Sequence, residues 1–264
     1  MKRIGMCACA LAAALLAGTA GAAATLRSAI GEVKVVTGQA APSAAKKGQA
    51  IASGATINTG ETGRAILRFD DGQVVALYGN TSFKIDEYKF EAAKPGAGSA
   101  FFSLVRGAIR AVTGLIGQRN ARAVAFRAPQ ATIGIRGTDF MMATVNPLYL
   151  NVLSGEVTAA NAGGTATFGA GAFGTVQSST MLATAIPGAA LPGGVSTAFS
   201  QLAGMDLAGV AGGAAQGAGA GAAGAGAGAG TGAAIAIGAG VAAAAAIGGG
   251  GGGSSPAHTT SSHH

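Results

Sequence analysis

Two adjacent carboxylate pairs, Asp70-Asp71 and Asp86-Glu87, are the side chains that could do general acid–base chemistry. A glycosidase-type site needs two carboxyl groups that face one cleft. Asp70-Asp71 precedes a glycine at a predicted strand turn, where aspartate serves the backbone. Asp86-Glu87 falls on a predicted strand, where neighbouring side chains point to opposite faces. Neither pair therefore predicts a catalytic site.

Residues 30–161 contain neither cysteine nor histidine. Their lack excludes Cys/His and Ser/His/Asp catalysis in this segment, and the usual zinc sites with them. The two cysteines of the chain are Cys7 and Cys9, and its three histidines follow Pro256. We therefore expect a protein that is not an enzyme and that has no cofactor or metal site.

The most unusual local string is G-I-R-G-T-D-F, residues 134–140. Its candidate functional residues are Gly134, Arg136, Gly137, Thr138, Asp139 and Phe140. In one interpretation, Arg136 presents its guanidinium to a carboxylate or phosphate of a partner. In the other, which we favour, Arg136 pairs with Asp139 and fixes a bulge in which Gly137 has a positive φ.

Positive charge is concentrated around this string, in a chain with a formal net charge of +7. No acidic residue lies between Glu91 and Asp139, whereas basic residues recur there: Lys94, Arg106, Arg110, Arg119, Arg122, Arg127 and Arg136. Such a block could meet an anionic envelope glycan or a phospholipid surface. In the alternative interpretation, these basic residues occupy strand positions that face water. Nucleic acid is not an expected partner, because no nucleic-acid-binding motif accompanies the charge.

Short strands are expected to position these residues. Arg64 to Phe69 alternates apolar and polar residues with the period of a half-buried strand. Asp71-Gly72 follows and predicts a two-residue type I′ turn into Gln73–Tyr78. Residues 101–116 also fit a helical stripe, but Gly107 and Gly114 favour a strand interpretation. About ten short strands separated by turns predict an all-β domain, built as a sandwich, a barrel or a coiled β stack.

The composition of the ends predicts the domain boundaries. Residues 1–24 have the charged start, apolar run and small-residue exit of a secretory signal peptide, so we expect a periplasmic or secreted protein. The β-domain is expected over residues 30–161, or to 177 if a further hairpin is added, and residues 178–207 are expected to be a linker. Residues 208–264 form a Gly/Ala-rich tail that we expect to be disordered. Its apolar stretch is too short to cross a bilayer, so membrane anchoring through the tail is not expected.

Four motifs, in order, resemble those of the FecR-domain family. They are G-x-x-I-x-x-G-A-T-I-N-T-G-E-T-G-R-A-I-L-R-F-D-D-G-Q-V-V-A-L (residues 48–77), L-V-R-G-A-I-R (104–110), A-T-I-G-I-R-G-T-D-F (131–140) and L-S-G-E-V (153–157). The resemblance implies a periplasmic or extracellular β-domain used for protein contact or signal sensing. Family members regulate a sigma factor through a cytoplasmic N-terminal segment. Here a signal peptide is expected in that place, which implies a secreted form without the anti-sigma segment.

The sequence therefore predicts an exported, non-catalytic envelope protein whose FecR-like domain mediates protein interaction or ligand sensing. The expected partner is another envelope protein or an anionic envelope glycan. The alternative is a structural or surface-associated protein that is tethered through its low-complexity C-terminal tail.

Overall fold

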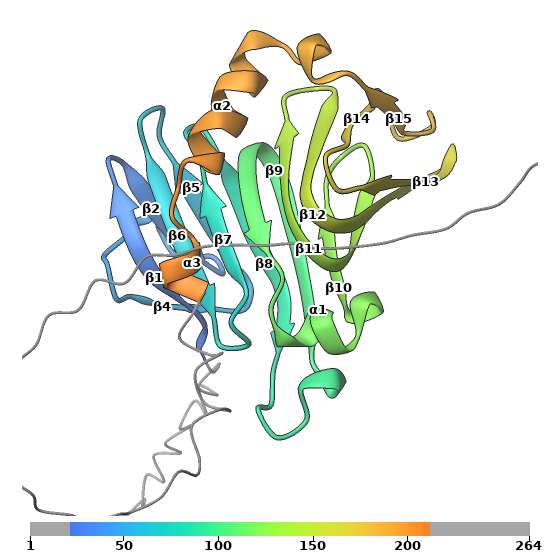
Figure 1. Ribbon diagram of the computed structural model, residues 1–264. Helices are drawn as coiled ribbons and strands as arrows, with labels where there is room; N and C mark the ends of the chain where they lie inside the picture. Colours follow the sequence, from blue (N-terminus) through green and yellow to red (C-terminus); the bar gives the residue numbers. More distant parts are fainter. Residues whose placement is uncertain (1–21, 212–264) are drawn as a thin grey trace, which may run out of the picture. The chain divides into compact units, whose positions relative to one another are not determined.

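The computed structural model describes residues 22–211 (Figure 1). The chain divides into two compact units, residues 1–220 and 221–264, and every described residue lies in the first. Most of the expected signal peptide and tail thus lie outside the described residues. The described part begins with strand β1 (Ala22–Ile30), so the last residues of the expected signal peptide, Ala22 to Ala24, belong to a strand.

Strands dominate the described residues. After β1, the first half of the chain contains β2 (Val33–Thr37), β3 (Ser43–Ala44), β4 (Ala50–Ala52), β5 (Ala55–Thr59), β6 (Arg64–Phe69), β7 (Val74–Leu77), β8 (Ser82–Lys89) and the 3-10 turn η1 (Pro95–Ala97). The second half contains β9 (Ser99–Val112), α1 (Leu115–Arg119), η2 (Ala121–Ala123), β10 (Val124–Arg127), β11 (Thr132–Thr144), β12 (Leu148–Asn161), β13 (Gly164–Gly169), β14 (Phe173–Val176), β15 (Thr184–Ile186), η3 (Gly188–Ala190), α2 (Gly193–Ala203) and α3 (Ala208–Ala211).

All strands of the described residues join one continuous hydrogen-bonded sheet, which confirms the predicted all-β class. Its main path runs β15-β14-β12-β11-β10-β9-β7-β6-β1-β4. The long strand β9 changes partners along its length: its first part pairs with β8 and β10, and its second part with β7 and β11. Since β11 also pairs with β10, the sheet curls back on itself, as the curved strands of Figure 1 show.

One face of the sheet forms the main apolar core. The alternation predicted for β6 is confirmed, because Ala65, Leu67 and Phe69 are fully buried. From Phe69 a chain of rings crosses the core through Phe102 and Phe126 to Phe140, with centroids 5.1, 4.9 and 5.2 Å apart. These separations are typical of favourable aromatic pairs. The core therefore extends to the last residue of the G-I-R-G-T-D-F string.

The opposite face of the sheet is covered by α2, within the segment 178–207 that we expected to be a linker (Figure 1). The buried face of α2 consists of Val195, Ala198, Phe199 and Leu202, which recur at helical spacing. It packs on a patch of the sheet made by Val74, Ala76, Ala108, Met141, Ala143 and Tyr149. The segment contains Pro187 and Pro192, which are typical of a linker, but Pro192 caps the start of the helix. The linker expectation is thus corrected, because an amphipathic stripe follows this proline.

Two predicted hairpins also differ in detail. The turn after β6 is not type I′, since Gly72 has a φ of 85° whereas Asp71 is not among the residues with positive φ. Instead, the N–H of Gly72 donates to the carbonyl oxygen of Phe69, and the N–H of Phe69 donates to the carbonyl oxygen of Gln73, which closes a longer loop. The strands expected within residues 165–177 form as β13 and β14, but each pairs with β12 rather than with the other.

The ambiguous segment 101–116 is mostly strand, as we predicted. It is extended through β9 to Val112 and turns helical at Leu115, where α1 begins.

Candidate functional site

The G-I-R-G-T-D-F string lies in β11 where this strand passes from β10 to β9 as its neighbour. The register of β11 against β12 shifts between Arg136 and Asp139, and Gly137 has a φ of 60°. The predicted bulge with a left-handed glycine is therefore confirmed. Gly155 lies opposite on β12 with a φ of 77°, and a Cβ added there would collide with the carbonyl oxygen of Gly137. Two glycines thus let the strands approach at the bulge.

Asp139 does not pair with Arg136, so this predicted ion pair is wrong. Its carboxylate accepts hydrogen bonds from Arg110 on β9, at 2.9 Å from Nε to Oδ1 and 2.7 Å from Nη2 to Oδ2. The reason is the change of neighbours along β11. Asp139 lies in the half of β11 that pairs with β9, whereas Arg136 lies before the bulge.

Arg110 also binds the end of α2. Its Nη1 donates to the carbonyl oxygens of Leu202 at 3.2 Å, Ala203 at 3.0 Å and Met205 at 3.3 Å. The last carbonyls of a helix lack partners within the helix and carry partial negative charge, which a cation stabilises. The hydrogen bond to Asp139 raises the pKa of Arg110. This guanidinium therefore holds α2 against the sheet.

Two further residues of the string have structural roles. Thr138 is buried, and its backbone N–H donates to Thr113 Oγ1 at 2.9 Å, while this hydroxyl donates to the carbonyl of Thr138 at 2.8 Å. Phe140 packs edge-on against Phe126 in the core. These contacts fix the strand just after the bulge.

Arg136 is exposed, and no ion pair among the described residues involves it. It lines a cleft of about 340 Å³ on the outer face of β10, β11 and β12, together with Arg122 and Glu156. Gly134 of the string lies in the same cleft, beside Ala125. We call this cleft the arginine groove. Its two guanidinium groups and small neighbours leave room for a carboxylate or phosphate on this surface.

The carboxylate pairs of the sequence do not form an acid–base site. Asp71 accepts hydrogen bonds from the backbone N–H of Gln73 at 3.0 Å and of Ile116 at 3.3 Å, and from Tyr88 Oη at 3.2 Å. It therefore joins the β6–β7 loop to the start of α1. Burial raises its pKa.

Asp86 and Glu87 have separate partners. Asp86 accepts from the hydroxyl of Ser103, and Glu87 accepts from that of Ser99 at 2.8 Å. The hydrogen bond from Ser99 lowers the pKa of Glu87 most, and the hydrogen bond and positive charge of Lys89 lower it further. Within residues 22–211, no group of three or more His, Cys, Asp or Glu side chains is placed to hold a metal ion.

Arg110 is the residue that the sequence interpretation missed. It ends the string L-V-R-G-A-I-R, and nothing in its spacing from Asp139 connects the two. Only the pairing of β9 with β11 brings them together.

Comparison with known proteins gives one family match. Residues 55–158 match the model of the family described as FecR protein. This range includes the G-I-R-G-T-D-F string and both strands that hold the Arg110–Asp139 pair, and it ends before α2. No curated protein matches the sequence.

Two crystal structures of a proposed anti-sigma factor from Parabacteroides distasonis are similar over part of the chain. One is 15% identical with a TM-score of 0.39, and the other is 13% identical with a TM-score of 0.40. Each match covers 50% of this chain and 58% of the other. In the described residues, no helix has the length and apolarity that a membrane crossing requires.

Proposed function

We propose that this protein is a non-catalytic sensing or interaction module of the bacterial cell envelope, periplasmic or secreted, that recognises an acidic segment of another envelope protein through the arginine groove. The observation that carries the proposal is Arg136. The bulge at Gly137 holds it on the surface, and Asp139 does not neutralise it because Arg110 occupies that carboxylate. A guanidinium kept free in this way can donate two parallel hydrogen bonds to a partner's carboxylate.

The charge of the groove favours a protein partner over an anionic glycan. Glu156 lies directly across from Arg136 in the β11–β12 ladder, although no ion pair links them. A regularly repeating polyanion would bring one of its charges close to Glu156, and like charges at short range repel. A peptide segment can instead place one carboxylate at Arg136 and a neutral or basic residue at Glu156. The family supports this direction, since FecR proteins are regulatory rather than enzymatic.

Binding of two probes to the full chain tests the proposal: a synthetic peptide with a single aspartate among neutral residues, and polygalacturonate. We expect Arg136→Ala and Arg122→Ala each to weaken binding of the peptide while the free energy of unfolding stays within about 0.5 kcal/mol of the original, as for other surface substitutions. Arg27→Ala is the matched control, because Arg27 is an exposed arginine on β1. Equal losses in all three variants would show unspecific charge attraction and reject the groove. Stronger binding of polygalacturonate would reject the peptide in favour of a glycan.

A tethered structural role through the tail stays a hypothesis. Residues 212–264 lie outside the described residues, and no contact of the described domain favours that role over recognition.

A further inference from the structure

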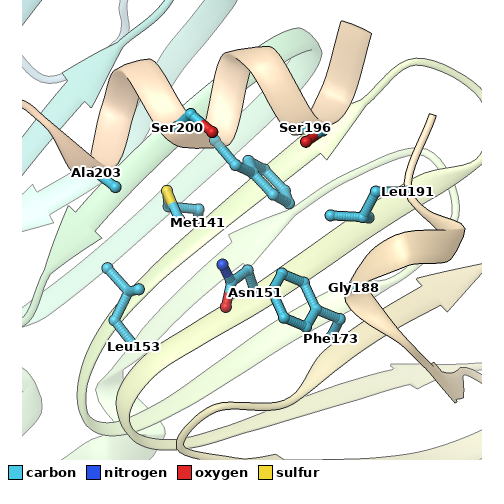
Figure 2. A pocket seen from close by; sticks show the side chains of 10 residues that line it. Met141, Asn151, Leu153, Phe173, Gly188, Leu191, Ser196, Ser200 and Ala203 are labelled. Atoms are coloured by element: carbon cyan, nitrogen blue, oxygen red, sulfur yellow. The ribbon is translucent and has the colours of Figure 1, made fainter. Parts of the chain in front are cut away.

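A second cleft, of about 270 Å³, lies beneath α2 on the face of the sheet that this helix covers (Figure 2). Met141, Asn151 and Phe173 line it from the sheet, and Leu191 and Phe199 from the chain that passes over it. We call it the α2 cleft. It is built mostly from residues after the segment that matches the FecR family, and it shares no lining residue with the arginine groove.

Strand register places one polar side chain in the middle of this apolar site. Asn151 on β12 pairs with Met141 of β11 on one side and with Phe173 of β14 on the other. Figure 2 shows its carboxamide between these two side chains, directed into the cleft. Only 8% of Asn151 is exposed. A thioether and an aromatic ring therefore flank the polar side chain of a residue that is nine-tenths buried.

The Asn151 carboxamide has no partner within the described protein. Its oxygen and nitrogen make no side-chain hydrogen bond with any described residue. The buried side-chain atoms that lack a hydrogen-bond partner among the described residues belong to Arg68, Gln73, Gln130 and Thr144, so the Asn151 amide keeps contact with solvent through the cleft. A molecule that filled the cleft would have to hydrogen-bond this amide, because an amide removed from water without hydrogen bonds costs free energy. The amide is therefore available to a ligand in the cleft.

The other walls define the chemistry of that ligand. No charged side chain of residues 22–211 lines the α2 cleft, so an ion placed there would lose its hydration without gaining an opposite charge from them. Besides Asn151, the polar side chains are Ser196 and Ser200 on α2, which lie one helical turn apart on the same side. A sugar ring would leave most of its hydroxyl groups against apolar walls. A peptide group needs one acceptor and one donor, and a carboxamide supplies both.

We infer that the α2 cleft binds a short uncharged peptide segment, with an apolar side chain between Met141, Phe173 and Phe199 and a peptide group hydrogen-bonded to Asn151. The cleft of about 270 Å³ is slightly smaller than the roughly 300–1,000 Å³ of clefts for drug-sized ligands, so it fits a ligand below that size. It thus admits one large apolar residue with its adjoining peptide groups. The ligand would contact the sheet and α2 together.

The test is an NMR titration of the full chain with N-acetyl-leucine N-methylamide as the probe. We expect saturable shifts of the Asn151 side-chain amide and of the methyl groups of Met141 and Leu191, with the Arg136 signals unmoved. Asn151→Leu should weaken binding about tenfold, as expected for the loss of one hydrogen-bonded pair. Gln118→Leu, on the exposed side of α1, should bind the probe as the original protein does.

Further arms make each outcome decisive. Ser200→Trp changes an exposed residue of α2 and would fill the mouth of the cleft, so it should abolish binding even if Asn151→Leu does not fold. The absence of saturable shifts with the probe would overturn the inference. Tighter binding of N-acetyl-leucine as the carboxylate would overturn the uncharged ligand, and equal binding of methyl glucoside would overturn the peptide. Binding of the acidic peptide to the arginine groove is measured with other probes and other variants. This inference and the proposed function can therefore fail separately.

Discussion

Arg110 on β9 binds Asp139 on β11 through two parallel hydrogen bonds, and the same guanidinium donates to the last two carbonyl oxygens of α2 and to that of Met205 just after the helix. The side chains of the pair are only 14% and 21% exposed. Charge-assisted bidentate contacts of this kind are among the strongest hydrogen bonds in proteins. One residue thus joins two strands of the segment that matches the FecR family to a helix that lies outside this segment.

Substitution of either partner should destabilise the fold. We expect Asp139→Ala to lower the free energy of unfolding by about 1.5–3 kcal/mol, the range for hydrogen bonds to charged groups. Arg110→Ala should cost more, because it also leaves the carbonyls of α2 without their donor. Chemical denaturation measures both losses, and amide hydrogen exchange should show faster opening of α2 in Arg110→Ala. Equal exchange in α2 would contradict the proposed anchoring.

Arg136 provides the matched control for this pair. In a double-mutant cycle, Arg110 and Asp139 should show a coupling energy of about 0.5–3 kcal/mol, as residues in direct contact do. Arg136 and Asp139 should be additive, because Arg136 has no bond to Asp139 in the described structure. A clear coupling between Arg136 and Asp139 would mean that the carboxylate changes partners in solution.

Local features of the sequence predicted much of the fold. Alternation in Arg64–Phe69 gave the buried face of β6, and the glycine at 137 indicated the bulge of β11. Both depend on a few neighbouring residues, namely the two-residue period of a strand and the ease with which glycine adopts a positive φ.

The contacts that the sequence did not predict are long-range. Asp139 has a candidate partner three residues away in Arg136, yet it binds Arg110, which is distant in sequence and adjacent in the sheet. In the sequence, Asn151 is one polar residue of a strand, and only the packing of α2 places it in a cleft. In each case the pairing order of the strands decides the contact. A hydrophobic period does not specify that order.

The bulge offers a prediction about two glycines. Gly137→Ala should cost about 1–2 kcal/mol, because the left-handed conformation is unfavourable for a residue with a Cβ and no atom lies within 4 Å of the added carbon. Gly155→Ala should cost more, since its Cβ would collide with the carbonyl of Gly137 in addition to the same strain. Denaturation of the two variants side by side tests the order. A smaller loss for Gly155→Ala would show that the bulge relaxes easily.

The first strand makes a prediction about processing. Ala23 and Ala24 are buried in β1, and Ala24 pairs with Phe69. The sequence offers two A-x-A cleavage sites, A-G-A at residues 20–22 and A-A-A at residues 22–24. Cleavage after Ala22 keeps both buried alanines, whereas cleavage after Ala24 removes them. We therefore expect the exported chain to start at Ala23, as read by intact mass or N-terminal sequencing. A chain made to start at Thr25 should melt at a lower temperature, and exported protein that starts at Thr25 would contradict this.

The last prediction concerns pH and the buried carboxyl of Asp71. Burial raises its pKa above the ordinary value of 3.8, against the hydrogen bonds from Gln73, Ile116 and Tyr88 that lower it. The folded state therefore holds the proton more tightly than the unfolded state, so the stability that this group contributes is fully present below pH 3.8 and is lost as pH rises through the raised pKa. Asp71→Asn does not ionise, and any hydrogen bond that it loses is independent of pH. The unfolding free energy of the original protein relative to Asp71→Asn should therefore fall as pH rises from about 3, and then become level.

Glu87→Gln is the control of opposite sign. Ser99 and Lys89 hold the pKa of Glu87 below 4.5, so the stability from Glu87 is present above pH 4.5 and is lost as pH falls. Urea denaturation across this range measures both differences. If the difference for Asp71 rose with pH as that for Glu87 should, the hydrogen bonds to its carboxylate would outweigh its burial.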